Sequence, residues 1–239
     1  ADLGRLDVDV DELAVLGVDG QVTGVPAEPA LAAGLRAALA VADPVVRSAA
    51  LEVLRALRLG DAGLYAARLG DPEADVRIHA VRALVSVDAV GALAEAAGDR
   101  AREVRVAVAK GLAAVRGARP GPLDPLLGDP DPLVRGAALG ALATTGCPGP
   151  YAERAVAALA GDPAWQVRAG AAAALSAAGP GAAVPPLAKA LADANADVRK
   201  AAVLALLAHR DDPAARSALA TATADPDADV RAYAARAAA

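Results

Sequence analysis

Apolar residues recur along most of the chain at the spacing of an amphipathic helix. After Val76-Arg77, alanine, valine and leucine stand at offsets 4, 5, 7 and 8 from the valine, which places them on one helix face. A second apolar stretch, long enough for a shorter helix, precedes such a dipeptide, as in residues 31–42, 88–98 and 150–161. The pattern therefore predicts pairs of helices joined by a tight turn.

This helix pair is repeated along the chain. The dipeptide Val-Arg recurs in phase, and successive arginines lie 28 to 33 residues apart, at Arg47, Arg77, Arg105, Arg135, Arg168, Arg199 and Arg231. An aspartate stands six residues before each arginine except the first, where Asp43 stands four before, so the first unit departs from the pattern. One helix pair cannot bury its own apolar face, but stacked pairs can. We therefore predict an all-α solenoid of about seven helix pairs.

The first residues do not follow the repeat. The segments "LDVDV" and "QVTGV" alternate apolar and polar residues, with "VDG" between them, which fits a short hairpin or an irregular cap. We therefore divide the chain into an N-terminal cap over residues 1–30 and one solenoid domain over residues 31–239.

Composition and charge narrow the class of protein. The chain is 56% hydrophobic but has no Phe or Met and one Trp, so its interior must consist of Ala, Leu and Val. The formal charge of −5, with acids and bases interleaved, argues against nucleic acid as a partner. The single cysteine cannot form an internal disulfide, which suits a reducing compartment, and we expect a cytoplasmic protein. No uninterrupted apolar run of about 18 residues predicts a membrane span, and the acidic first residues do not resemble a signal peptide.

The recurring aspartate and arginine have a physical role in such an array. In an Asp-Pro turn before a helix, the carboxylate can accept hydrogen bonds from the backbone N–H groups of the turn or the helix start. The arginine, one residue past the core valine, sits at the edge of the seam between helices and has enough donors to bridge two adjacent turns. We therefore interpret these charged residues as architecture rather than catalysis.

The motif D-P-x-x-x-V-R-x-x-A-x-x-A-L, with some substitutions, covers residues 42–239. It resembles the HEAT-repeat family and, more narrowly, the short bacterial form called phycobilisome-lyase-like. The resemblance implies a right-handed α-α superhelix in which this aspartate and arginine form a ladder from repeat to repeat. The ladder residues that it implies are Asp71, Arg77, Asp129, Arg135, Asp162, Arg168, Asp193, Arg199, Asp225 and Arg231. Asp99 and Arg105 match in spacing, but the turns at Asp99 and Asp193 lack the proline, which puts their geometry in doubt.

Other candidate chemistry is sparse. His79 and His209 have no second ligand at helical spacing, and the acidic run at residues 7–12 lacks the glycine and the final glutamate of a calcium loop. Cys147 lies in a loop between repeats without a histidine nearby in sequence. We therefore expect no catalytic residue, no metal ion and no cofactor.

A partner would meet the second helix of each pair, which lines the concave face of such a solenoid. The free positions at offsets 2, 3, 6 and 9 from the valine are small and uncharged in the middle of the array and basic towards both ends. Three glycines at helix-interior positions are a cost that close approach of a partner would explain. The predicted partner-binding residues are Arg82, Lys110, Gly136, Gly140, Ala173, Lys200, Leu204, Tyr233, Arg236 and Trp165. The tryptophan is either an interface anchor or lies flat on the adjacent turn.

The sequence thus predicts a non-catalytic scaffold or adaptor that binds another protein or peptide through its concave face. The alternative is an enzyme, either a DNA-acting protein similar to HEAT-like alkylpurine glycosylases or a lyase-type accessory protein. A neutral groove favours the adaptor, whereas a continuous basic cleft that holds an aromatic residue and an acid favours the enzyme. Because the last unit stops within a helix, self-association through that end is a further expectation.

Overall fold

The computed structural model describes residues 27–236 and divides the chain into two compact units, residues 1–59 and 60–239. The described residues form fourteen α-helices, joined by turns and short 3₁₀ segments, and contain no strand. The prediction of an all-helical solenoid of helix pairs is confirmed. Residues 1–26, and with them most of the predicted cap, lie outside the described residues.

The described part of the first unit is one helix pair, α1 (Ala27–Ala38) and α2 (Pro44–Ala56). Asp43 caps α2 by accepting the N–H of Val45, and a proline follows at the first helical position. Arg47 donates to the carbonyls of residues 41 and 42, the turn before its own helix. Val46, the first in-phase valine, is 41% exposed, so this unit also departs from the repeat in its packing.

The second unit holds six helix pairs. They are α3 (Ala62–Ala66) and α4 (Ala74–Ser86), α5 (Val90–Glu95) and α6 (Arg102–Ala114), α7 (Asp124–Leu127) and α8 (Pro132–Thr145), α9 (Gly149–Gly161) and α10 (Trp165–Ala174), α11 (Pro180–Ala190) and α12 (Ala196–Leu207), and α13 (Pro213–Ala222) and α14 (Ala228–Ala235). The 3₁₀ segments η2 (Ala67–Gly70), η3 (Ala96–Gly98), η4 (Gly121–Leu123) and η5 (Leu175–Ala177) extend or precede the helices beside them.

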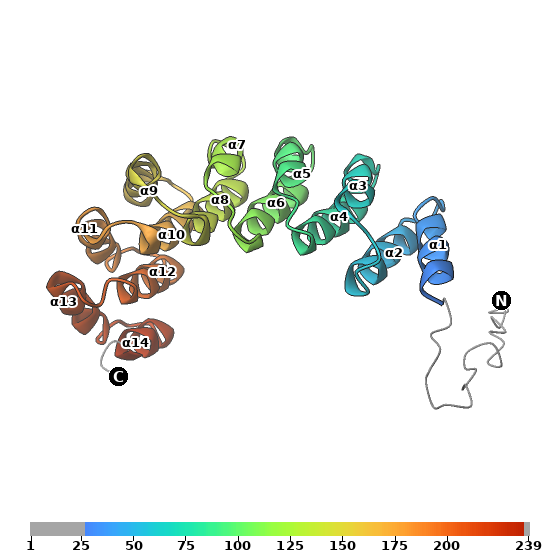
Figure 1. Ribbon diagram of the computed structural model, residues 1–239. Helices are drawn as coiled ribbons and strands as arrows, with labels where there is room; N and C mark the ends of the chain where they lie inside the picture. Colours follow the sequence, from blue (N-terminus) through green and yellow to red (C-terminus); the bar gives the residue numbers. More distant parts are fainter. Residues whose placement is uncertain (1–26, 237–239) are drawn as a thin grey trace, which may run out of the picture. The chain divides into compact units, whose positions relative to one another are not determined.

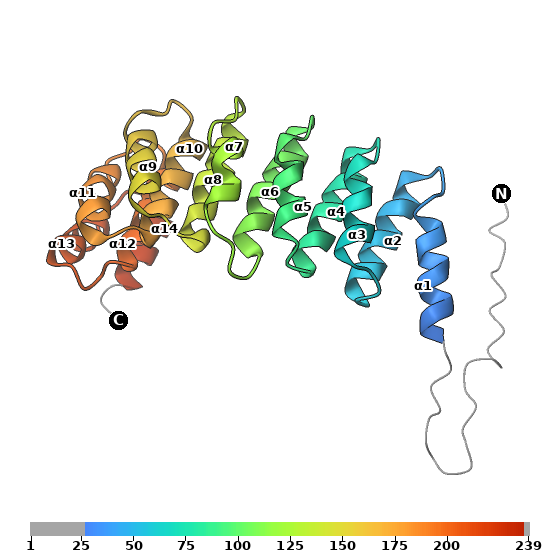
Figure 2. The same ribbon diagram turned by 45° about the horizontal axis from the view of Figure 1, so that its top comes forward.

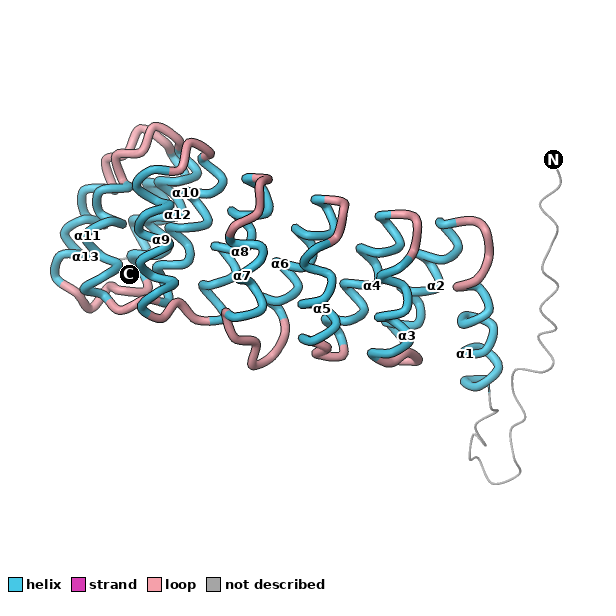
Figure 3. Tube along the Cα trace, turned by 90° about the horizontal axis from the view of Figure 1, so that it is seen from above, coloured by secondary structure: helices cyan, strands magenta, loops and turns pink. Residues whose placement is uncertain are grey.

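Within the second unit the pairs stack in a row with two layers (Figure 1). The second helix of each pair, α4, α6, α8, α10, α12 and α14, packs against the equivalent helix of the next pair, and we call this layer the inner row. The first helices of the pairs form the outer row, and Figure 2 shows the two rows from a second direction. The loops lie at the two ends of the helix pairs (Figure 3).

The recurring valine anchors the core of every pair in the second unit. These valines are at most 1% exposed, at Val76, Val104, Val134, Val167, Val198 and Val230. Each buried side chain of this size contributes about 2 kcal/mol of hydrophobic free energy. Alanine and leucine at offsets 4 and 8 are buried with it, as Ala80 and Leu84 show. The apolar face that the sequence pattern predicts is therefore the face that meets the neighbouring pairs.

Two glycines let α8 and α10 approach closely. A Cβ atom on Gly170 would lie 2.1 Å from the carbonyl oxygen of Gly136, and one on Gly136 would lie 2.6 Å from the carbonyl oxygen of Gln166. The sequence suggests that a partner needs this space, but at these two positions the backbone of the neighbouring helix needs it. At Gly140 an added Cβ would meet nothing within 4 Å, so no such requirement exists there.

Candidate functional site

The repeated arginines join successive helix pairs. In the second unit every repeated arginine except the last, Arg231, forms an ion pair with the aspartate that stands one repeat later in the sequence. The closest N–O distances are 2.7 Å for Arg77–Asp99, 2.6 Å for Arg105–Asp129, 3.1 Å for Arg135–Asp162, 2.7 Å for Arg168–Asp193 and 2.8 Å for Arg199–Asp225. We call this series the ladder. The ladder runs between successive repeats, so each of these arginines binds the carboxylate of the next repeat's aspartate and not that of its own motif.

The same residues also stabilise the turn within each repeat. Arg105 donates through Nη1 to the carbonyl oxygen of Asp99, six residues earlier, at 2.9 Å. The carboxylate of Asp129 accepts the N–H of Asp131, two residues later, at 2.8 Å. Each arginine therefore stabilises the turn of its own repeat and the turn of the next repeat. It does so with the bidentate geometry that a guanidinium group provides.

The turns without proline have the same geometry. Asp99 accepts the N–H of Ala101 and Asp193 accepts the N–H of Asn195, both at 2.8 Å, which equals the distance in the Asp129 turn with proline. Because the bond needs only the N–H two residues after the aspartate, the residue between them is free to vary.

The ladder carboxylates of Asp193 and Asp225 are held in their ionised form. Hydrogen bonds from Arg168 lower the pKa of Asp193, and those from Arg199 lower the pKa of Asp225, while partial burial opposes both shifts. An acid with a lowered pKa and a bound guanidinium group cannot donate a proton near neutral pH. These residues are therefore unsuited to general acid catalysis.

The C-terminal end of the ladder differs from its middle. Arg231 donates to the carbonyl oxygens of Asp225 and Pro226, and it has no carboxylate partner among the described residues. Asp71 accepts the N–H of Glu73 and its carbonyl accepts from Arg77. The predicted pair Asp71 and Arg77 is thus in contact through a backbone carbonyl.

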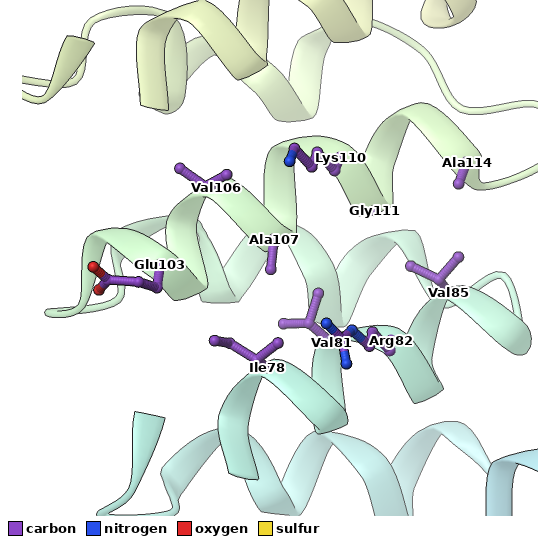
Figure 4. Close-up of a pocket in the computed structure, with 10 residues that line it drawn as sticks. All are labelled: Ile78, Val81, Arg82, Val85, Glu103, Val106, Ala107, Lys110, Gly111 and Ala114. Atoms are coloured by element: carbon purple, nitrogen blue, oxygen red, sulfur yellow. The ribbon is translucent and has the colours of Figure 1, made fainter. Parts of the chain in front are cut away.

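A hollow of about 410 Å³ lies between α4 and α6 on the inner row (Figure 4). Most of its lining is apolar, with Ile78, Val81, Val85, Val106, Ala107, Gly111 and Ala114 beside the charged Arg82, Lys110 and Glu103. The labelled side chains come from both helices, with Ile78 and Arg82 on α4 and Val106 and Lys110 on α6. Several of these positions stand at the offsets that the sequence analysis gave as free.

A second hollow of about 500 Å³ adjoins the first between α6, α8 and α10. It is lined by Arg102, Glu103, Val106, Lys110, Leu133, Gly136, Ala137, Trp165 and Gln166. Glu103, Val106 and Lys110 belong to both hollows, so the two form one continuous surface, which we call the groove. Trp165 is 39% exposed and lines this part of the groove, so its ring is within reach of a bound molecule.

Two cations of the groove are available to a partner. Arg82 and Lys110 are exposed, and neither has a hydrogen-bond or ion-pair partner among the described residues. The remaining charges compensate one another, because Arg102 pairs with Glu103 at 2.8 Å and lies 3.7 Å from Asp131. The groove therefore presents an apolar floor with two unpaired positive charges.

At the other end of the inner row, one of the two predicted basic residues is surrounded by acids. Lys200 lies 3.1 Å from Asp229, 3.5 Å from Asp197 and 4.0 Å from Asp227, so acidic side chains surround its charge. Arg236 lies over the ring of Tyr233, 4.8 Å from the ring centroid. Leu204 is exposed on α12, the helix that also carries Lys200. The surroundings of Lys200 are therefore acidic, and the role of these residues in binding stays a prediction.

The middle of the inner row is neutral, as the sequence indicated. Gly140 on α8 and Ala173 on α10 are half-buried, and Gly136 is buried. Sequence reasoning missed Glu103, Leu133 and Gln166, which precede the core valines of their helices by one residue. One more helical turn towards the N-terminus on the same face would have identified them.

Cys147, the candidate nucleophile, and His209 both lie in surroundings typical of structural residues. Cys147 is buried, and burial raises the pKa of its thiol to about 11, which keeps it protonated and unreactive. Nε2 of the buried His209 lies 2.9 Å from the carbonyl oxygen of Leu175. Across residues 27–236 no group of three or more His, Cys, Asp or Glu side chains is placed to hold a metal ion. None of the described helices combines the length and apolar character that a membrane crossing requires.

Comparison with known proteins assigns this architecture. The profile of the family described as HEAT repeats matches residues 62–143, 120–206 and 152–239. YibA of Escherichia coli has a similar fold over 91% of this chain and 76% of its own, with a TM-score of 0.54 and 22% identity. An engineered protein is similar over 87% of this chain and 67% of its own, with a TM-score of 0.53 and 19% identity. No curated protein sequence matches. At 22% and 19% sequence identity, these two similarities show a shared fold and nothing more.

Proposed function

This chain belongs to the HEAT-repeat family, and we propose that it is a non-catalytic scaffold that binds another protein or peptide along its inner row. The observation that carries the proposal is the groove over α4, α6, α8 and α10, where two adjoining hollows share an apolar floor. Buried apolar contact provides affinity, and a few placed charges provide orientation.

The charges of the groove select the class of ligand. With Arg82 and Lys110 unpaired and Arg102 already neutralised by Glu103, the groove favours a segment that combines apolar side chains with carboxylates. Trp165 offers an aromatic surface at the other end of the same groove. The ligand is therefore an acidic, apolar peptide segment, either extended or helical.

A probe peptide tests this proposal directly. We expect a 12-residue peptide of alternating glutamate and valine to bind and to change the fluorescence of Trp165, the single tryptophan of the chain. Lys110→Glu replaces attraction by repulsion and should weaken binding about tenfold. Lys189→Glu is the matched control, because it makes the same charge change on α11 of the outer row.

Two results would contradict the scaffold proposal. One is equal affinity of the wild-type protein and the Lys110→Glu variant for the glutamate peptide. The other is equal binding of a twin peptide in which lysine replaces every glutamate, since that would remove any role for the charges of the groove.

A DNA-acting enzyme is the second candidate, because the groove brings Trp165 together with Glu103 and Lys110. These are the aromatic, acidic and basic residue types that such an enzyme needs. Two unpaired cations are a small footprint for duplex phosphates, and for this reason we favour the peptide. Release of a base from alkylated duplex DNA by the wild-type protein, and its loss in a Glu103→Gln variant, would support the enzyme instead.

The finer assignments belong to the same proposal. The recurrence of the D-P-x-x-x-V-R motif supports the short bacterial subfamily, and a lyase-type accessory role rests on that resemblance alone. The single buried cysteine, which has no second cysteine to pair with, supports a cytoplasmic location. Fractionation of the native cell with an antibody against this chain would test the location.

A further inference from the structure

Two exposed apolar side chains line the second hollow of the groove. Among the described residues of the second unit, the exposed large apolar side chains are Val87, Leu133, Trp165 and Leu204. Leu133 and Trp165, which are 40% and 39% exposed, both line this hollow of about 500 Å³ and stand in the first turns of α8 and α10. Apolar surface gathered in this way marks a ligand-binding surface, whereas single exposed side chains are ordinary.

The floor of this hollow is made of small residues. Gly136 and Ala137 of α8 line it beside the two larger side chains. A Cβ atom on Gly136 would lie 2.6 Å from the carbonyl oxygen of Gln166, so the packing of α8 on α10 keeps this position without a side chain. A flat ring can lie on a floor of this kind, with its face or edge against the indole of Trp165.

The unpaired charges of the groove lie towards the first hollow, the one between α4 and α6. Arg82 lines the first hollow alone, and Lys110 lines both; Figure 4 shows the two side chains on neighbouring helices. In the second hollow Arg102 is paired with Glu103 at 2.8 Å and lies 3.7 Å from Asp131. The two hollows therefore suit different groups, carboxylates in the first and an uncharged side chain in the second.

We propose that the second hollow binds one aromatic side chain of the peptide, while carboxylates of the same peptide meet Arg82 and Lys110. This inference rests on the proposed function, because it adds a requirement to the same ligand. An aliphatic side chain would fill the hollow but would lack the ring-to-ring contact with Trp165. Since Lys110 lines both hollows, the aromatic residue and an acid lie close together in the peptide.

A pair of matched peptides tests this assignment. Both are 12-residue peptides of alternating glutamate and valine, in which one central valine is replaced by phenylalanine in the first and by leucine in the second. We expect the wild-type protein to bind the phenylalanine peptide about fivefold more tightly, because the ring adds its contact with Trp165 to a similar apolar burial. Isothermal titration calorimetry measures both affinities, and we call their ratio the aromatic preference.

Variants of the protein separate the two hollows. Trp165→Leu should reduce the aromatic preference to about one, because it removes the indole ring and keeps an apolar side chain. Arg82→Glu should weaken both peptides about tenfold and leave the aromatic preference unchanged, because Arg82 does not line the second hollow.

A leucine pair gives a second test that does not depend on the tryptophan. Leu133→Ala removes apolar surface from the second hollow and should weaken the phenylalanine peptide about threefold. Leu57→Ala is the matched control, since this leucine of the first unit is 50% exposed and lines neither hollow, and it should leave the affinity unchanged. All these side chains are exposed, so we expect the variants to fold, and circular dichroism would verify it.

The outcomes distinguish this inference from the scaffold proposal. If the wild-type protein binds both peptides equally, or if Trp165→Leu keeps the fivefold preference, the aromatic site is refuted and the scaffold proposal stands. Equal effects of Leu133→Ala and Leu57→Ala would likewise refute the aromatic site. If neither peptide binds the wild-type protein, both the scaffold proposal and the aromatic site fail.

Discussion

Removing one rung of the ladder should destabilise the protein by an amount that the structure allows us to estimate. Arg105→Ala deletes two hydrogen bonds to the Asp129 carboxylate, at 2.6 and 3.0 Å, and a bond to the Asp99 carbonyl at 2.9 Å. The two side chains are 15% and 7% exposed, so the lost pair is largely removed from water.

Breaking a buried pair by removing one partner costs about 3–5 kcal/mol, because the other charge stays buried. Asp129 would keep the bond from the Asp131 N–H, and we therefore expect the lower end, about 3 kcal/mol. For a chain of this size the melting temperature falls by about 2–4 °C per kcal/mol, so the expected decrease is roughly 6–12 °C.

Arg135 provides an internal comparison. Its bonds to Asp162 are longer, at 3.1 and 3.5 Å, and the side chains are 23% and 16% exposed. Arg135→Ala should therefore cost less, about 1.5 kcal/mol. Thermal melts followed by circular dichroism would compare both variants with Lys189→Ala, an exposed control on α11. If Arg105→Ala and Lys189→Ala melt at the same temperature, the ladder does not stabilise the array.

Three further changes follow from the packing and the charges. Gly170→Ala should lower the melting temperature, because its Cβ would meet a carbonyl of α8 at 2.1 Å, whereas Gly140→Ala, with open space around the Cβ, should raise stability by about 0.5 kcal/mol. Since Asp193 and Asp225 have a lower pKa in the folded state than the value of about 3.9 in the unfolded chain, their contribution is present above that pH. It is lost as the pH falls through the folded-state pKa, which urea titrations between pH 2.5 and 6 would show. Cys147, with its pKa raised to about 11, should resist thiol reagents at pH 8 until the protein unfolds.

Each of these has a clear contrary result. Equal melting points for the two glycine variants would mean that α8 and α10 separate without cost. A stability that rises as the solution is made acidic would contradict the sign of the aspartate shifts. Rapid labelling of Cys147 in the native protein, at the rate found in denaturant, would mean that its loop opens freely.

The repeat and its core could be derived from the sequence because both depend on local periodicity. A helix returns to the same face about every 3.6 residues, so the offsets from Val76 fix which side chains turn inwards, and the structure buries those of Ala80 and Leu84. The turn is local in the same way, because the aspartate accepts the backbone N–H two residues later in the sequence. This bond forms with the proline, as at Asp129, and without it, as at Asp99.

The tertiary structure decided everything that depends on how neighbouring pairs stack. The sequence cannot tell whether Arg105 reaches its own Asp99 or the next Asp129, because that choice depends on the spacing and tilt of adjacent helices. For the same reason, only the folded chain shows that Gly136 admits a neighbouring helix and that aspartates enclose Lys200. Periodicity defines the faces of single helices, whereas contacts across 28 to 33 residues of sequence arise when those faces are packed together.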